Sequence, residues 1–216
     1  MECAEYSLDE LLCQSLLLFR QYRLYDDPDC FVNASRMLEE ARRLIDNTQS
    51  GVDMAKWGCV VECLAQKFYI SSDTDTMLGE FDVALAAYWK RIEKSPLEPF
   101  TVYLWLGYYC LLRFRNGHSH SHSRSKQMMS NILSFLIDTF RKFKEDTIPA
   151  EILPFFSADI WGETVCWMEQ VHDTRICEKQ SAVLLGQLYN MKKMEVQQEQ
   201  GTQDTLLQHI LEFYCF

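Results

Sequence analysis

The chain has 216 residues and a formal net charge of −10, with 31 acidic residues against 21 Lys and Arg. Hydrophobic residues make up 48% of it and aromatic residues 13%, which excludes disorder as the dominant state. The acidic balance argues against a large nucleic-acid footprint, which needs a basic stripe to displace counterions from phosphates. Gly and Pro number only 8 and 5, too few for the turns of a β-sandwich or barrel, so we expect an all-α fold.

The nine Cys do not indicate a secreted disulfide framework. Their number is odd, and the beginning MECAEYSLDELL lacks the basic segment and apolar run of a signal peptide. Several of them lie inside apolar helical patterns, where Cys behaves as a small hydrophobe: Cys13, Cys59, Cys63, Cys110 and Cys166. We therefore expect an intracellular location, in the cytoplasm or the nucleus, and no membrane attachment.

The first predicted helix begins after Ser7, which forms a capping box with Glu10. Its apolar stripe consists of Leu8, Leu11, Leu12, Leu16 and Phe19. The stretch Tyr25-Asp26-Asp27-Pro28 ends it, and Pro28 suits the first position of a second helix to about Asp46. The apolar side of that second helix carries Phe31, Ala34, Leu38, Ala41 and Ile45.

Turn-forming clusters separate the helices that follow. In NTQSGVD, Asp53 is expected to cap a third helix that runs to about Tyr69. The polar link SSDTDT leads into a fourth helix, which contains GEFDVALAAYWKRIEKSP and is closed by SPLEP. A fifth helix over about Phe100–Phe114 is the longest apolar run; it is too short to span a membrane and is expected at the centre of the core.

The remaining sequence predicts one flexible loop and three or four more helices. The loop is the His/Ser-rich segment RNGHSHSHSRS at 115–125, which is too polar to pack. A sixth helix follows to about Lys144, and further helices cover Ala158–Asp173, Ile176–Lys193 and Thr205–Phe216. No segment shows strand alternation, so residues 1–216 are expected to form a single all-helical domain.

The fourth helix contains spacings that resemble a known repeat. Its small, aromatic and helix-ending residues fall at the offsets of the second helix of a tetratricopeptide repeat: Gly79, Phe81, Ala84, Tyr88 and Pro96. Leu106-Gly107 after Tyr103, and Leu185-Gly186 before Tyr189, resemble parts of the first helix. Arg91 stands where the pattern has a second small residue, and the spacing between repeat-like pieces is irregular.

This resemblance implies antiparallel helix pairs that form a short irregular α-solenoid, with a non-repeat helical bundle as the alternative. It also implies a protein-protein interaction scaffold that binds a peptide or helix of a partner. The residues expected to contact the partner are aromatic and apolar: Trp89, Tyr109, Trp161, Leu207, Ile210, Leu211, Phe213, Tyr214 and Phe216. The apolar C-terminal helix could equally bind a second copy of the chain.

No catalytic or cofactor motif occurs, and three candidate metal ligand sets are incomplete or have a simpler explanation. Cys59 and Cys63 are one helical turn apart but have no matching second pair. Glu169 and His172 form a lone Glu-x-x-His pair, which we interpret as surface polar residues. His118, His120 and His122 would lie on one side of an extended segment and could bind a transition metal weakly. The expectation is a non-enzymatic adaptor; the alternative is a helical enzyme whose Cys/His or carboxylate site is assembled from distant positions.

Overall fold

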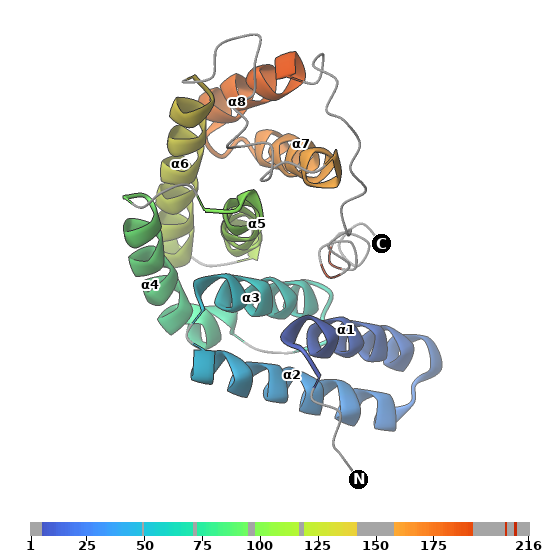
Figure 1. Cartoon of the computed structure of the whole chain (residues 1–216). Helices are drawn as coiled ribbons and strands as arrows, with labels where there is room; N and C mark the ends of the chain where they lie inside the picture. Colours follow the sequence, from blue (N-terminus) through green and yellow to red (C-terminus); the bar gives the residue numbers. More distant parts are fainter. Residues whose placement is uncertain are drawn as a thin grey trace. The chain divides into compact units, whose positions relative to one another are not determined.

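The computed structural model describes residues 6–48, 50–70, 73–94, 98–116, 119–141 and 158–191, with Leu206 and Ile210. The regular structure of these residues is entirely helical, which confirms the all-α class (Figure 1). The eight helices are α1 (Leu8–Tyr25), α2 (Pro28–Thr48), α3 (Gly51–Gln66), α4 (Thr74–Ile92), α5 (Phe100–Asn116), α6 (Ser119–Arg141), α7 (Ala158–Asp173) and α8 (Glu178–Met191).

The chain divides into two compact units. Unit 1 comprises Met1–Phe81 and Asp204–Phe216, and unit 2 comprises Asp82–Gln203. The helix α4 therefore begins in unit 1 and ends in unit 2. The single domain expected from the sequence stays a prediction.

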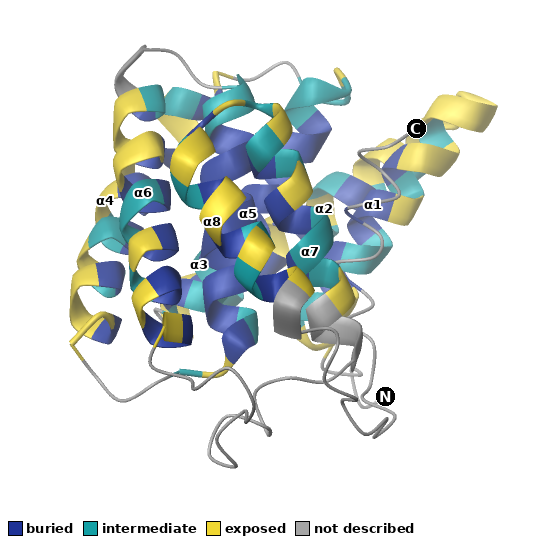
Figure 2. Ribbon diagram, turned by 90° about the horizontal axis from the view of Figure 1, so that it is seen from above, coloured by how far each residue is buried: buried dark blue, intermediate teal, exposed yellow. Residues whose placement is uncertain are grey.

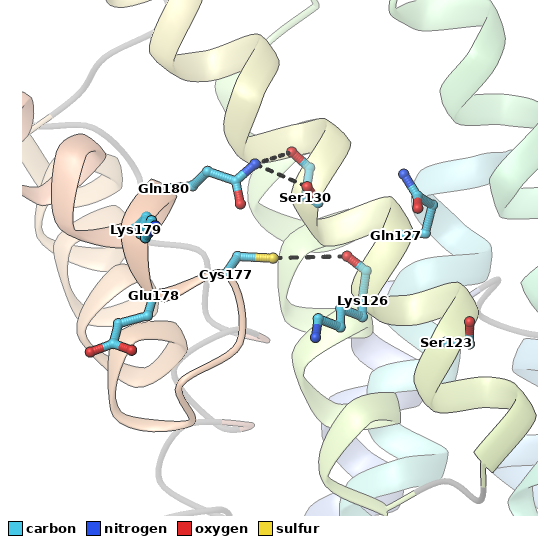
Figure 3. A pocket seen from close by; sticks show the side chains of 8 residues that line it. All are labelled: Ser123, Lys126, Gln127, Ser130, Cys177, Glu178, Lys179 and Gln180. Carbon is cyan, nitrogen blue, oxygen red and sulfur yellow. Dashed lines mark hydrogen bonds between the residues drawn. The ribbon is translucent and has the colours of Figure 1, made fainter.

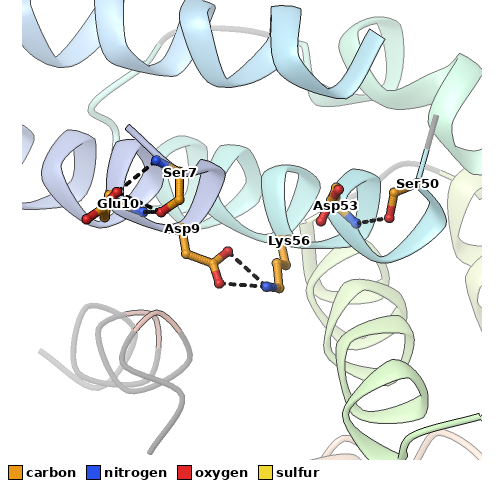
Figure 4. Close-up of polar contacts among 6 residues, drawn as sticks. All are labelled: Ser7, Asp9, Glu10, Ser50, Asp53 and Lys56. Atoms are coloured by element: carbon orange, nitrogen blue, oxygen red, sulfur yellow. Dashed lines mark hydrogen bonds and ion pairs between the residues drawn. The ribbon is translucent and has the colours of Figure 1, made fainter. Parts of the chain in front are cut away.

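The first two helices of unit 1 form an antiparallel hairpin. The capping box at the start of α1 is confirmed, since the backbone N–H of Ser7 donates to Glu10 Oε2 at 2.8 Å and the N–H of Glu10 donates to Ser7 Oγ (Figure 4). Asp26 ends α1 with a left-handed backbone, and Pro28 begins α2 as predicted. The buried sides of the two helices carry Leu11, Leu12, Leu16, Phe19, Ala34, Leu38, Ala41 and Ile45.

The third helix packs on both members of this hairpin. It begins three residues earlier than the sequence suggested, because Ser50 rather than Asp53 is its N-cap: Ser50 Oγ accepts the N–H of Asp53 at 3.3 Å (Figure 4). Lys56 Nζ lies 2.8 Å from both carboxylate oxygens of Asp9 and so joins α3 to α1. The indole N–H of Trp57 donates to the carbonyl of Leu38 on α2.

Unit 2 is built around α5, which is buried on all sides from Val102 to Arg113, as expected for the central core helix (Figure 2). Helices α6 and α7 pack on it, and α8 packs on both of these. Gly107 is required for this arrangement because a Cβ there would overlap the indole ring of Trp167 on α7. By contrast, open space surrounds the positions where Gly79 and Gly186 would carry a Cβ.

A buried charge pair joins the second half of α4 to α5. Asp82 accepts two bonds from the guanidinium of Arg113, at 3.2 Å and 2.7 Å, and a third from the hydroxyl of Tyr109 at 2.6 Å. Both partners of the pair are buried. Such a pair is tolerated only because its hydrogen bonds compensate for the loss of water.

The prediction of a flexible loop at 115–125 is wrong for the described residues of this His/Ser-rich segment, which are helical. Arg115 and Asn116 end α5, and α6 begins at Ser119, so the described part of the segment is helical; Gly117 and His118 are outside the described residues. Ser121 and Ser125 are buried one turn apart and continue into the buried face of α6 at Met128, Met129 and Ile132. Helical spacing of small residues toward the core therefore overrides the polar composition.

Candidate interaction surface

The predicted contact residues that the structure describes lie in the interior. Trp89, Tyr109 and Ile210 are buried, so they form no exposed surface. The Trp89 ring packs edge-on against Tyr103 and Phe135, with centroids 6.3 Å and 5.7 Å apart. The side chains of Trp161, Leu207, Leu211, Phe213, Tyr214 and Phe216 are outside the described part of the chain.

Trp89 is buried because the inward face of α4 differs from the one that the repeat pattern emphasised. That pattern placed Phe81, Ala84 and Tyr88 on one stripe. The buried stripe instead contains Leu78, Phe81, Leu85, Trp89 and Ile92, which also have three- and four-residue spacings. Ala84 and Tyr88 are only partly buried. Trp89 in the segment GEFDVALAAYWKRIEKSP is thus part of the hydrophobic core and not of an exposed binding surface.

Four strongly exposed apolar side chains lie near the ends of the three helices of unit 1 that pack together. We call this set the apolar end; its members and their exposed fractions are Leu24 (67%), Tyr25 (75%), Val32 (63%) and Phe68 (93%). Leu24 and Tyr25 finish α1, Val32 lies in the second turn of α2, and Phe68 follows α3. Figure 2 shows the exposed end of the α1–α2 hairpin in yellow.

Aromatic contacts hold the three helices together beneath the apolar end. Phe31 on α2 packs against Phe19 and Tyr22 on α1, with ring centroids 5.6 Å and 5.3 Å apart. Phe19 also contacts Tyr69, which follows α3, at 5.9 Å. Arg23 extends its guanidinium over the Tyr69 ring and donates to the carbonyl of Lys67. The end of α3 therefore lies beside the last turns of α1.

Phe68 has a backbone conformation that usually requires glycine. Its φ is +60°, in the left-handed region. The N–H of Phe68 donates to the carbonyl of Ala65, and the N–H of Tyr69 donates to the carbonyl of Leu64. These two bonds define a Schellman cap with Phe68 at the position where Gly is the common residue. A large side chain is thus both strained and almost fully exposed at this position.

Three carboxylates surround the turn between α1 and α2. Asp26, Asp27 and Asp29 are all exposed. Asp27 has a structural function, since its Oδ1 accepts the N–H of Asp29 at 3.0 Å in the first turn of α2. Asp26 has the left-handed backbone that ends α1, which Asp tolerates, and Asp29 lies in the first turn of α2, where the helix dipole favours a carboxylate. The apolar end is therefore bordered by negative charge at the turn.

A second surface feature is a polar groove of about 530 Å³ between α6 and the start of α8 (Figure 3). Its lining comprises Ser123, Lys126, Gln127, Ser130, Cys177, Glu178, Lys179 and Gln180. Gln180 donates to Ser130 and Ser134 on α6 at 2.9 Å each. Burial raises the pKa of Cys177, so its thiol stays protonated at neutral pH. The described lining contains no imidazole that could deprotonate this thiol.

The candidate metal ligands of the sequence do not converge. Among the described residues no three His, Cys, Asp or Glu side chains are close enough to hold a metal ion. Cys59 and Cys63 are buried in α3, and burial raises the pKa of Cys63. Glu169 accepts the hydroxyl of Tyr189 at 2.6 Å, whereas His172 pairs with Ser181. The backbone of α6 is helical at His120 and His122 and so lacks the extended geometry that the predicted chelator requires, whereas His118 is outside the described residues.

Comparisons of the chain with protein-family models, curated proteins and solved structures find no match. Within the described residues, no helix combines the length and the hydropathy of a transmembrane segment.

Proposed function

We propose that the chain is a non-enzymatic adaptor that binds a partner protein through the apolar end of unit 1. In this account its helices form a short irregular α-solenoid that resembles tetratricopeptide-type helix pairs. The successive pairing of α1 with α2, α5 with α6 and α7 with α8 supports such an arrangement. The partner is another protein or a second copy of the chain, and the location is intracellular.

The observation that carries this proposal is Phe68. A non-glycine residue in the left-handed region costs about 1–2 kcal/mol, and an exposed Phe gains no burial to offset that cost. A residue that stability alone does not explain is a candidate for function, because strain concentrates at binding sites. Large aromatic side chains are also the commonest energetic centres of protein interfaces.

The enzyme alternative has less support. The polar groove offers a protonated thiol, two lysines and hydroxyl groups, but the residues that line it place no base beside Cys177. A nucleophilic cysteine needs a lowered pKa or an adjacent base. The geometry of the described residues therefore favours binding over catalysis.

The proposal is tested by quantitative affinity capture from cells that produce the protein. Tagged wild type is compared with Phe68→Ser and Leu24→Ser, each of which removes an exposed apolar side chain from the apolar end. Val183→Ser is the matched control, because Val183 is an exposed apolar residue of α8 in unit 2. We expect both apolar-end variants to lose a stoichiometric partner that the control retains.

Retention of every partner by both apolar-end variants would exclude this surface as the binding site. Circular dichroism and urea unfolding of each variant show whether it is folded, so that a lost partner is not attributed to a misfolded chain. Size-exclusion chromatography with light scattering distinguishes a second copy of the chain from a different protein.

A further inference from the structure

We infer that the partner of the apolar end is a basic, amphipathic segment of another protein, with apolar side chains on Leu24, Tyr25, Val32 and Phe68 and Lys or Arg side chains over the α1–α2 turn. This inference rests on the proposed function and adds the chemistry of the partner. Two observations of charge support it: the position of the carboxylates at the turn, and the net charge of the unit to which they belong.

The charges at this end are divided between two sides. The carboxylates of Asp26, Asp27 and Asp29 lie around the turn. The cations of this end are Arg20 and Arg23 on α1 and Lys67 at the end of α3. Arg23 is directed toward α3, since its guanidinium lies 5.5 Å from the centroid of the Tyr69 ring. Cationic side chains of a bound segment would therefore be stabilised over the turn and disfavoured on the α3 side.

The net charge of the whole chain belongs to the unit that carries the apolar end. Met1–Phe81 and Asp204–Phe216 together contain 7 Lys and Arg but 17 Asp and Glu, a net charge of −10. Asp82–Gln203 contains 14 of each and has a net charge of zero. A field of one sign raises the encounter rate of oppositely charged partners and disfavours acidic ones.

The test uses defined peptides rather than an unknown partner. The probe is a fluorescent helical peptide of about 18 residues with Leu on one face and Lys on the other. A second peptide has Glu in place of Lys, and a third has the Leu and Lys in scrambled order. Fluorescence anisotropy at about 0.15 M salt measures their dissociation constants for the full chain, where charges are screened beyond about 8 Å.

Two double variants distinguish binding that depends on the carboxylates at the turn from binding that depends only on the overall negative charge of unit 1. Asp26→Asn/Asp29→Asn removes two carboxylates at the turn, keeps the Asp27 cap, and places at position 26 a residue that tolerates the left-handed backbone. Glu39→Gln/Glu40→Gln removes the same charge from exposed positions of α2. Glu39 is ten residues from Asp29, or about 15 Å along the helix, beyond the screening length.

We expect the Leu/Lys peptide to bind the wild type about tenfold more tightly than the Leu/Glu and the scrambled peptides. Asp26→Asn/Asp29→Asn should weaken its binding about fivefold, Glu39→Gln/Glu40→Gln less than about twofold, and Phe68→Ser about tenfold. Equal binding of the Leu/Lys and Leu/Glu peptides, equal weakening by the two double variants, or no binding of the Leu/Lys peptide would each overturn the inference.

Failure of this inference is distinguishable from failure of the proposed function. Native-partner capture that is lost in Phe68→Ser but unchanged in Asp26→Asn/Asp29→Asn contradicts the basic partner and leaves the adaptor function in place. Capture that Phe68→Ser leaves unchanged contradicts both.

Discussion

At the residue scale, Gly107 permits a contact that no other residue allows. Its missing Cβ leaves room for the indole ring of Trp167, which is buried and cannot move away without disturbing its neighbours. Gly107→Ala should therefore destabilise unit 2 by about 2–3 kcal/mol in urea unfolding. Gly186→Ala is the matched control: its Cβ meets open space, so it should stabilise α8 by up to about 1 kcal/mol. Similar effects at the two glycines would contradict the packing of α7 on α5.

The capping box of α1 should make stability depend on pH. Hydrogen bonds from the backbone N–H and the hydroxyl of Ser7 hold the pKa of Glu10 below its ordinary value of 4.5. A carboxyl with a lowered folded pKa stabilises the protein above its unfolded pKa, and this contribution is lost as pH falls through the folded value. Wild type should thus exceed Glu10→Gln in unfolding free energy near neutral pH, and the difference should shrink between about pH 5 and pH 3. A difference that stays constant over this range would contradict the assignment.

Sequence was informative about several residues whose determinant is local, although it assigned the N-cap of α3 to Asp53 and not to Ser50. Ser7 with Glu10 and Pro28 were predicted correctly, because each satisfies or avoids a backbone N–H within its own helical turn. Phe68 was not found, since the third helix was extended to about Tyr69 and the left-handed cap cannot be recognised when Phe replaces Gly. Whether Trp89 faces the core or the solvent could not be predicted either. Two sets of residues on α4 have helical spacing, and only the packing of neighbouring helices determines which set is buried.

At the element scale, the Asp82–Arg113 pair attaches α4 to α5. Arg113→Met leaves a buried carboxylate without its cation and should cost about 3–5 kcal/mol in urea unfolding. Adding Asp82→Asn removes that charge and preserves an acceptor for the hydroxyl of Tyr109, so the double variant should recover part of the loss. A double variant less stable than Arg113→Met would show that the charge pair is not what attaches α4.

The order and approximate bounds of most described helices could be predicted because apolar spacing and turn residues are properties of single segments. The predicted helix at Thr205–Phe216 lies largely outside the described residues. The bounds of α7 agree with the prediction. The start of α6 could not be predicted in this way. Its serines are buried only because their helix packs in unit 2, and His122 stacks on Phe114 of α5 with ring centroids 4.9 Å apart. Polar composition alone therefore suggested a loop where tertiary contacts form a helix.

At the scale of the whole molecule, the two compact units differ in net charge. Amide hydrogen exchange can test whether they unfold separately. If they do, Arg113→Met should accelerate exchange in α5 and leave the protection of α1 and α2 unchanged. Loss of protection in both sets of helices would indicate a single cooperative domain, as the sequence suggested.

The candidate site could not be predicted from sequence. Of the contact residues expected from the sequence, packing places Trp89, Tyr109 and Ile210 in the core. The side chains of the others lie outside the described residues, and those predictions stay untested. The apolar end depends instead on three helix termini that come together in the fold, and on one backbone angle. Neither the meeting of these termini nor the left-handed backbone of Phe68 produces a periodic pattern in the sequence.

Phe68→Gly tests the central claim most directly, because stability and binding should change in opposite directions. Gly relieves the left-handed backbone, so the unfolding free energy should rise by about 1 kcal/mol. The same change removes the exposed ring, so capture of the partner should be lost. A variant that is more stable and still captures its partner fully would contradict the account: the apolar end would then not be the binding surface.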